Sequence, residues 1–265
     1  MIQSKIAERN KCYTEGRART RTFGVLLHDT ATMNTGAERF AHVFNVYKPN
    51  GLSVCVHCFV DDTSIIEILP DNWRCWGCGS GAKGSGNDNY VQIEMCLPAG
   101  VEVDNKTWQY KIKAGSEDEV KKHIRKTLDN AEVYMVHILK KYKISSIDAG
   151  TVTSHYEAHA NGIASNHADP ARLLKLIGMN MDKVRAEVYK LMSMKDDVSN
   201  NSEYKLVRVT CKTLNVRREP TTGSVVTCRV HKGEVFTIVD YSADRTWGKL
   251  KSGAGWICLR YTEDL

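Results

Sequence analysis

The chain has 265 residues, of which 42% are hydrophobic and 26% are charged, and its formal net charge is +6. This composition is that of a globular protein with a full-sized core and room for a second, smaller module. No apolar run is long enough to span a bilayer, which excludes membrane insertion, and the first residues lack the pattern of a secretory signal. The modest positive charge favours attraction to polyanions; the last 63 residues carry +4 of it (11 Lys and Arg minus 7 Asp and Glu).

The first part of the chain alternates short strands with a helix. An irregular, polar segment over 1–22 comes first. The apolar periodicity then predicts a helix over 37–47 and strands over 23–27, 53–60, 65–69 and 91–95. His28 stands at the end of the first of these strands, and a long loop over 70–89, rich in Gly and Asn, precedes the last.

A long helix follows. Ser116 to Glu119 forms a capping box with acidic residues in the first turn, and apolar residues recur on one face to about Tyr142. Two shorter helices are predicted over 171–179 and 182–192. Strands, hairpins and a long packing helix together predict a mixed α/β fold, with a mixed central sheet flanked by helices.

The periodicity changes after a polar segment over 196–202. Five short alternating strands are predicted over 204–210, 225–230, 235–241, 247–250 and 255–259. Such a pattern is typical of a small all-β barrel. We therefore expect a first domain over 1–180, a helix and polar linker over 181–202, and a second domain over 203–265.

The segment from Thr151 to Pro170 holds three of the nine histidines, His155, His159 and His167, followed by Asp169. Its Asn-Gly step and closing Asp-Pro predict a shaped loop rather than a regular element. Imidazole and carboxylate are ligands that Zn²⁺ prefers in catalytic sites, usually three from the protein with one position left for water. The segment can supply two ligands, and the third must come from elsewhere.

The nine cysteines, without a secretory signal, indicate reduced thiols. Cys55-x2-Cys58 and Cys75-x2-Cys78 have the spacing of a four-cysteine zinc site, which is an alternative metal centre. Residues three apart in an extended strand point to opposite faces, and this argues against Cys55 and Cys58 sharing one metal. Whether these four bind metal stays open at this point.

Several motifs carry a resemblance to a known family. In chain order they are FGVLLHDTA, SVCVHCFVDD, WGCGSG, NYVQIEMC and SHYEAHANGIASNHADP. Together they resemble the zinc-dependent N-acetylmuramoyl-L-alanine amidases of the peptidoglycan-recognition and phage-lysozyme type, and phage endolysins in particular, over about residues 10–178.

The resemblance implies a zinc site and its catalytic groups. The zinc ligands would be His28, His155 and Asp169. Glu94 would take a proton from the zinc-activated water and pass it to the leaving amine. His167 stands where relatives often have Lys and would stabilise the oxyanion. Because a histidine loses its charge near neutral pH, activity would then depend on pH between roughly 6 and 8.

Trp76 and Asn166 are the candidate substrate contacts. Gly77 departs from relatives, which often have His after the Trp, so no substrate contact is expected from position 77. Val56 stands where some relatives place a catalytic Tyr, and this increases the dependence on Glu94.

Other polar residues near these motifs have alternative roles. His159 would share a metal with His155 if the two stood four apart on a helix, although Asn161-Gly162 argues against a continuing helix. Glu157 is an alternative general base, and His57 is either a partner of a ligand or a packed strand residue.

The C-terminal region resembles a bacterial SH3-like (SH3b) domain, on TLNVRREP, HKGE, WGKL and GAGWICLRY. Such domains in lytic enzymes bind the cell wall and tether the catalytic domain, which raises the effective substrate concentration.

The resemblances together imply an endolysin. It would cleave the amide between N-acetylmuramic acid and L-alanine in peptidoglycan, with the bacterial cell wall rather than nucleic acid as partner. It would wait in the host cytoplasm until release. The alternatives are a zinc peptidoglycan endopeptidase, a non-catalytic peptidoglycan-binding protein, and a nucleic-acid-binding zinc-ribbon protein. The oligomeric state is left open.

Overall fold

The computed structural model describes residues 2–45, 54–104, 106–107, 109–193, 205–242 and 244–265. The chain folds into two compact units, Met1–Ser193 and Met194–Leu265. The predicted linker over 196–202 lies outside the described residues. Within the described ranges, no helix has both the length and the apolar character needed to cross a membrane.

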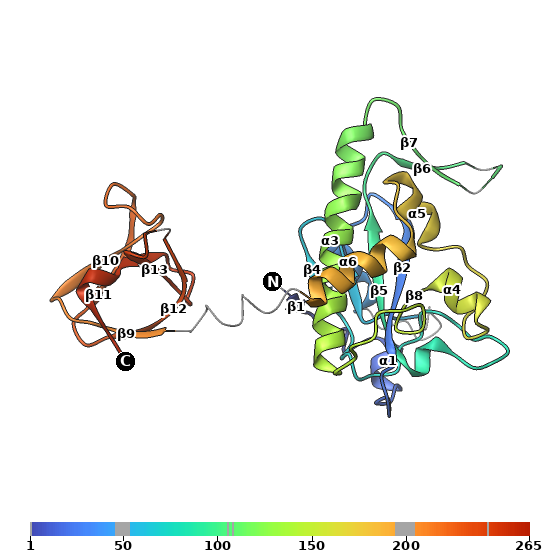
Figure 1. Ribbon diagram of the computed structural model, residues 1–265, viewed down its shortest axis with the longest axis horizontal. Helices are drawn as coiled ribbons and strands as arrows, with labels where there is room; N and C mark the ends of the chain where they lie inside the picture. The colour runs from blue at the N-terminus through green and yellow to red at the C-terminus, as the bar shows by residue number, and fades with distance from the viewer. Residues whose placement is uncertain (1, 46–53, 105, 108, 194–204, 243) are drawn as a thin grey trace. The chain divides into compact units, whose positions relative to one another are not determined.

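The first unit is built on a six-stranded sheet in the order β1-β4-β3-β5-β2-β8 (Figure 1). The strands are β1 (Ile2–Ser4), β4 (Ile65–Glu67), β3 (Cys58–Val60), β5 (Tyr90–Leu97), β2 (Gly24–Met33) and β8 (Val152–Ser154). Only the β3–β4 hairpin is antiparallel among the described pairs of this sheet. The central strands β5 and β2 are long and parallel, so their carboxyl ends lie at one edge of the sheet.

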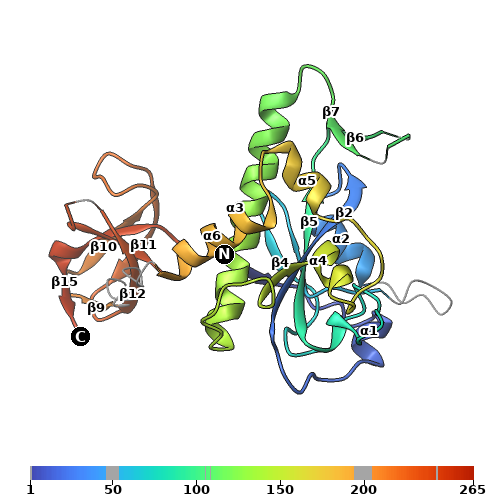
Figure 2. The same ribbon diagram turned by 45° about the vertical axis from the view of Figure 1, so that its right-hand side comes forward.

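Helices and a small hairpin surround this sheet. They are α1 (Lys11–Thr14), α2 (Ala37–Phe44), the 3₁₀ turn η1 (Gly86–Asp88), the β6–β7 hairpin (Val101–Val103 and Tyr110–Ile112), α3 (Glu117–Lys141), α4 (His155–Ala160), α5 (Ala171–Leu176) and α6 (Met181–Ser193). Helix α3 runs along the sheet, and α6 packs against α3 (Figures 1 and 2). The predicted helix over 182–192 is therefore part of the first compact unit.

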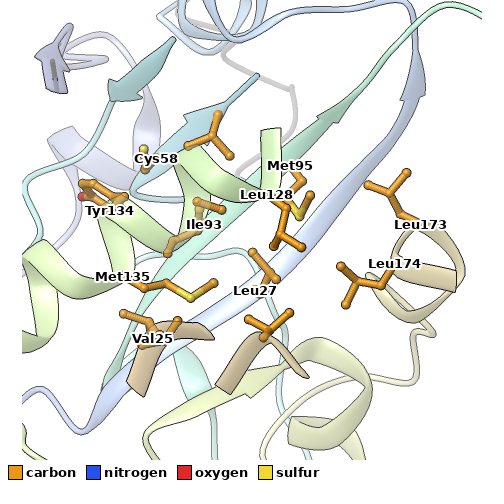
Figure 3. Close-up of a cluster of buried hydrophobic side chains, with 14 of the residues drawn as sticks. Val25, Leu27, Cys58, Ile93, Met95, Leu128, Tyr134, Met135, Leu173 and Leu174 are labelled. Atoms are coloured by element: carbon orange, nitrogen blue, oxygen red, sulfur yellow. The ribbon is translucent and has the colours of Figure 1, made fainter. Parts of the chain in front are cut away.

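Alternation along β2 and β5 separates the core from the polar face. Val25 and Leu27 of β2 and Ile93 of β5 point to α3, where they pack with Leu128 and Tyr134 in the main apolar cluster (Figure 3). Because successive residues of a strand point to opposite faces, the residues between them point away from α3. That opposite face carries His28, Gln92 and Glu94, and it positions the candidate site.

The second unit is a seven-stranded antiparallel sheet in the order β11-β10-β14-β13-β12-β9-β15. Its elements are β9 (Lys205–Val209), β10 (Thr213–Arg217), β11 (Val226–His231), β12 (Val235–Tyr241), β13 (Trp247–Leu250), β14 (Trp256–Cys258), the 3₁₀ turn η2 (Leu259–Tyr261) and β15 (Thr262–Asp264). Alternate residues such as Val207, Val216 and Ile238 form its small core. The predicted fold class, a mixed sheet with helices followed by a small all-β region, is confirmed.

Some local predictions were wrong, and some elements were not predicted. The segment over 1–22 is not wholly irregular, because β1 pairs with β4 and α1 begins at Lys11. The hairpin β6–β7 was not predicted. The segment over 151–170 contains β8 and α4, because Ser154 caps the helix and Glu157 completes a capping box with it.

Candidate active site

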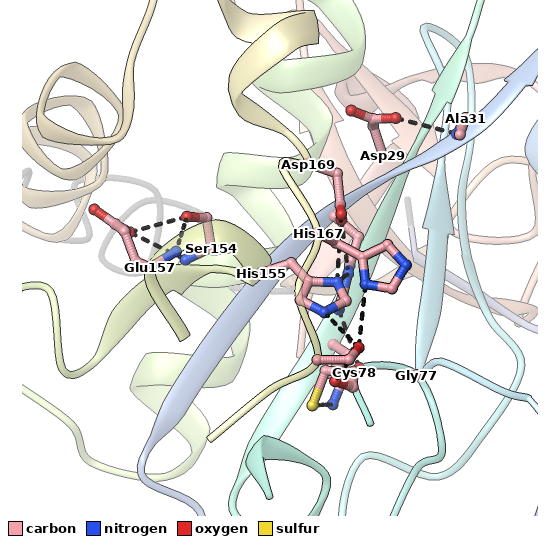
Figure 4. Close-up of polar contacts among 12 residues, drawn as sticks. Asp29, Ala31, Gly77, Cys78, Ser154, His155, Glu157, His167 and Asp169 are labelled. Carbon is pink, nitrogen blue, oxygen red and sulfur yellow. Dashed lines mark hydrogen bonds and ion pairs between the residues drawn. The ribbon is translucent and has the colours of Figure 1, made fainter. Parts of the chain in front are cut away.

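Three side chains converge on the face of the sheet that points away from α3. His28 comes from β2, His155 is the first residue of α4, directly after the neighbouring strand β8, and Asp169 follows on the loop that returns to α5. Nδ1 of His28 lies 3.0 Å from Oδ2 of Asp169 and 3.1 Å from Nδ1 of His155. Nδ1 of His155 lies 3.4 Å from Oδ1 of Asp169. Figure 4 shows His155 and Asp169 directed toward one point.

The cluster is buried and electrostatically coupled. His28, His155 and Asp169 are 2%, 3% and 6% exposed. Burial alone would raise the pKa of Asp169, but the contacts with His155 and His28 hold it well below its usual range. A potential ligand atom from each residue lies within 4.8 Å of the other two, and no other group of three or more His, Cys, Asp or Glu within the described ranges meets this condition. Two imidazole nitrogens and one carboxylate fit the donor set of a catalytic zinc site.

Glu94 lies on the strand next to His28. The two residues are direct partners in the β2–β5 register, so their side chains leave the same face of the sheet. Oε2 of Glu94 is buried and has no hydrogen-bond partner within the described part of the chain. Burial raises the pKa of Glu94 well above its usual range, and the nearby carboxylates of Asp169 and Asp29 add to this.

His167 reaches the cluster from the same loop as Asp169. Its ring centroid lies 4.5 Å from that of His155, and its Nδ1 is 3.1 Å from Oγ of Ser165 (Figure 4). His167 is exposed, as is Asn166 beside it. Desolvation and the neighbouring His155 lower the pKa of His167. An exposed imidazole next to a buried metal-ligand group can contact a bound substrate.

Trp76 is half-buried and packs against a second apolar cluster, which includes Cys55, Val56 and Phe59. Its partial exposure is compatible with a substrate contact.

The three residues with alternative roles in the sequence, His159, Glu157 and His57, make contacts outside the cluster. His159 is exposed, and its Nδ1 faces the carbonyl of Ala164 rather than the cluster. Glu157 is taken up by the capping box and by Arg185. His57 is fully buried, with Nε2 2.9 Å from the carbonyl of Trp73 and Nδ1 accepting the backbone N–H of Gln92.

The four-cysteine zinc site does not form. Cys55, Cys58, Cys75 and Cys78 are all described and buried, but they do not make up a metal-ligand group. Cys58 packs in the cluster beneath α3, whereas Cys55 and Cys75 pack in the cluster on the other face. The sheet therefore lies between Cys58 and both Cys55 and Cys75.

Fold and site together place the first unit in the architectural class of the amidase and peptidoglycan-recognition domains. The sequence model of the N-acetylmuramoyl-L-alanine amidase family (Amidase_2) matches residues 18–172. This match covers more than half of the chain and includes His28, Glu94, His155 and Asp169. The chain belongs to this family.

Individual relatives agree with this assignment. The chain is 26% identical to the amidase CwlH of Bacillus subtilis over 147 residues, 55% of this chain and 54% of CwlH. It is 38% identical to the amidase XlyA of the same organism over 72 residues, 27% of this chain and 24% of XlyA. The chain thus spans about half of CwlH and less of XlyA.

Solved structures share the fold. The hydrolase AmiA of Staphylococcus aureus superimposes with a TM-score of 0.54 at 21% identity, over 72% of this chain and 83% of AmiA. The PlyG catalytic domain gives 0.52 at 21% identity, over 73% of this chain and 96% of that domain.

Proposed function

We propose that the protein is a peptidoglycan hydrolase that cleaves the amide between N-acetylmuramic acid and L-alanine. The observation that carries this proposal is the buried convergence of His28, His155 and Asp169 within the segment matched by the amidase family. Two neutral imidazoles and one carboxylate are a donor set typical of hydrolytic zinc.

His28, His155 and Asp169 would hold the zinc ion. When bound, Zn²⁺ supplies a Lewis acid that polarises the amide carbonyl and makes water acidic enough to attack at neutral pH. The depressed pKa of Asp169 keeps this carboxylate ionised, and therefore able to bind a cation, across the physiological range.

Glu94 is the proposed general base and acid. A carboxyl group with a raised pKa can take a proton and return it to the leaving amine near neutral pH. Its buried, unpartnered Oε2 leaves one oxygen available for this transfer. His167 would donate an N–H to the oxyanion that develops on the scissile carbonyl. Trp76 and Asn166 would contact the substrate.

The C-terminal unit is proposed to be an SH3b domain that binds the cell wall. Its strands are antiparallel and surround a small core, and the +4 charge of residues 203–265 suits an anionic wall. Tethering would raise the local concentration of the scissile bonds. We propose 1–180 and 203–265 as the catalytic and binding domains, with α6 and the residues after it between them, in a bacteriophage endolysin that acts on the wall after release from the host cytoplasm.

The test combines zinc content with lysis of purified peptidoglycan. Wild type should carry one zinc ion, release new amino groups on alanine, and lose both properties after chelation. His28→Ala should lose both as well, whereas His42→Ala, at an exposed position of α2, should keep both. A wild-type protein that binds zinc yet releases no alanine amino groups would refute the amidase function. Release of other termini would point to an endopeptidase, and binding without cleavage to a wall-binding protein.

A further inference from the structure

The two histidine ligands have a second nitrogen each, and both of these nitrogens face protein oxygens. Nε2 of His28 lies 3.0 Å from Oε1 of Gln92. Nε2 of His155 lies 3.3 Å from Oγ of Ser165. A neutral imidazole carries one N–H, and its position decides which nitrogen can bind a metal. The partners of Nε2 therefore determine whether Nδ1, the nitrogen that faces Asp169, has a lone pair available for a metal ion.

The orientation of Gln92 follows from its own partners. Its Nε2 donates to Oδ1 of Asn87 at 2.9 Å, so Oε1 is the atom turned toward His28. The orientation of the Asn87 amide is set in turn by the backbone N–H groups of Gly77 and Cys78, which donate to its Oδ1 at 3.0 and 3.1 Å. Backbone N–H groups can only donate. The chain of hydrogen bonds from Gly77 and Cys78 to His28 thus has one consistent direction.

Ser165 is anchored to the same loop. Its Oγ lies 3.1 Å from the carbonyl oxygen of Cys78, which can only accept, so the hydroxyl donates there. The lone pairs of Oγ remain for the N–H on Nε2 of His155. The backbone N–H of Ser165 also donates to the carbonyl of Cys78, at 2.9 Å. Both histidines are thus oriented from one place, Cys78 and its neighbours.

Gly77 provides the space for this arrangement. A Cβ atom at position 77 would lie 2.3 Å from Oε1 of Gln92 and 2.8 Å from Cγ1 of Val56. Any side chain there would displace the oxygen that accepts from His28. This gives a physical reason for the Trp-Gly pair in this chain.

We propose that Gln92 is a positioning residue that holds His28 in the tautomer with the proton on Nε2, and that the Gly77–Cys78 loop and Asn87 hold Gln92 in place. The inference rests on the proposed zinc function of His28. In that tautomer Nδ1, the nitrogen directed at Asp169, is the one that can bind a divalent cation. Loss of an outer partner of a metal-bound histidine typically lowers affinity about 10–100-fold.

The experiment replaces Gln92 by Met, which keeps the side-chain length and removes the acceptor. The matched control is Gln109→Met at an exposed position. Zinc affinity is measured by competition with a chelator, and the tautomer of His28 is read in the metal-free protein from long-range ¹H–¹⁵N spectra. We expect the zinc Kd of Gln92→Met to rise about 10–100-fold and the Nε2–H form of His28 to lose its dominance, with no change in the control.

A second variant, Gly77→Ala, keeps every polar group and moves Oε1 of Gln92 instead. Gly77→Ala should also raise the zinc Kd and reduce the share of the Nε2–H form of His28. If circular dichroism shows that Gln92→Met is unfolded, Gly77→Ala is used in its place. If the folded variants keep the Nε2–H tautomer of His28, the proposal is wrong even where zinc affinity falls. The lower affinity would then come from a general loss of packing around the site. Wild-type cleavage of peptidoglycan is assayed in parallel. Zinc binding without cleavage would refute the amidase function but not the role of Gln92. That role is tested separately by the tautomer of His28 in the metal-free protein.

Discussion

Nη2 of Arg185 lies 2.9 Å from Oε1 of Glu157, and this ion pair joins α6 to the first turn of α4. Nη1 of Arg185 also lies 3.1 Å from Oε2 of Glu157 and donates to the carbonyl of Val152 at 3.0 Å. Glu157 in turn completes the capping box of Ser154 (Figure 4). Since His155 is the first residue of α4, the helix before the second unit helps to fix a proposed zinc ligand.

Arg185→Ala should therefore destabilise the first unit and weaken the metal site. The side chain of Arg185 is 12% exposed and that of Glu157 is 21% exposed, and breaking a largely buried pair costs about 3 kcal/mol. We expect a lower melting temperature and a several-fold higher zinc Kd. Arg39→Ala, on the exposed face of α2, should change neither. An unchanged zinc Kd in a destabilised Arg185→Ala would limit this ion pair to a role in stability.

Glu94→Gln should separate catalysis from metal binding. The amide is close in shape to the carboxyl group but can no longer accept and return a proton, so turnover should fall about 10²–10⁴-fold. Zinc content should stay near one per chain because Glu94 is not among the three proposed ligands. Activity of Glu94→Gln near the wild-type level would exclude this residue as the general base. Glu102→Gln, at an exposed position, is the control.

His57 should make the fold sensitive to acid. Burial lowers the pKa of His57 to about 3 from an ordinary 6.5, and the charge of Arg19 adds to this. Between these values the unfolded chain binds a proton that the folded protein does not, so stability falls as the pH decreases below about 6.5. At pH 4.5 the expected loss is about 2–3 kcal/mol.

The measurement is urea unfolding of wild type and His57→Gln from pH 7 to 4.5. The variant should be less stable at pH 7, since the hydrogen bonds to Trp73 and Gln92 are disturbed, but its stability should fall less with acid. Parallel pH profiles would show that His57 is not the cause of the acid sensitivity. The exposed His42→Gln serves as the control and should follow the wild-type profile.

Glu132 should have the opposite pH dependence. Burial raises the pKa of Glu132 to about 8, and a hydrogen bond with Glu187 adds to this, while Arg125 opposes it. The folded protein keeps a proton that the unfolded chain loses near pH 4.5, so stability falls as the pH rises from about 4.5 to 8. Glu132→Gln cannot ionise, and its stability relative to wild type should increase by at least about 1 kcal/mol from pH 5 to 9. Thermal unfolding at these two values tests this, and a constant difference would contradict it.

The sequence determined the fold class and named the metal-ligand candidates. His28 was recognised because it follows the apolar run over 23–27, although β2 continues beyond it to Met33. His155 and Asp169 were recognised because they stand in a dense His and Asp segment that resembles the amidases. Such features are local, and an apolar run that predicts a strand can be recognised from periodicity alone. The long helix α3 was predicted for the same reason, from its acidic first turn and its apolar face, but the capping box predicted at Ser116 does not form, since Ser116 makes no side-chain cap hydrogen bond.

Only the tertiary structure decided which polar groups meet. Gln92 is one more residue of a buried strand in the sequence, and Asn87 lies in a Gly-rich loop; their link to His28 depends on how the loop folds against the sheet. Glu157 and Arg185 are 28 positions apart and pair only because α6 packs beside β8. Cys55, Cys58, Cys75 and Cys78 have metal spacing, yet the sheet separates Cys58 from Cys55 and Cys75. Hydrogen bonds are short and directional, so spacing along the chain does not determine them, and the packing of whole elements does.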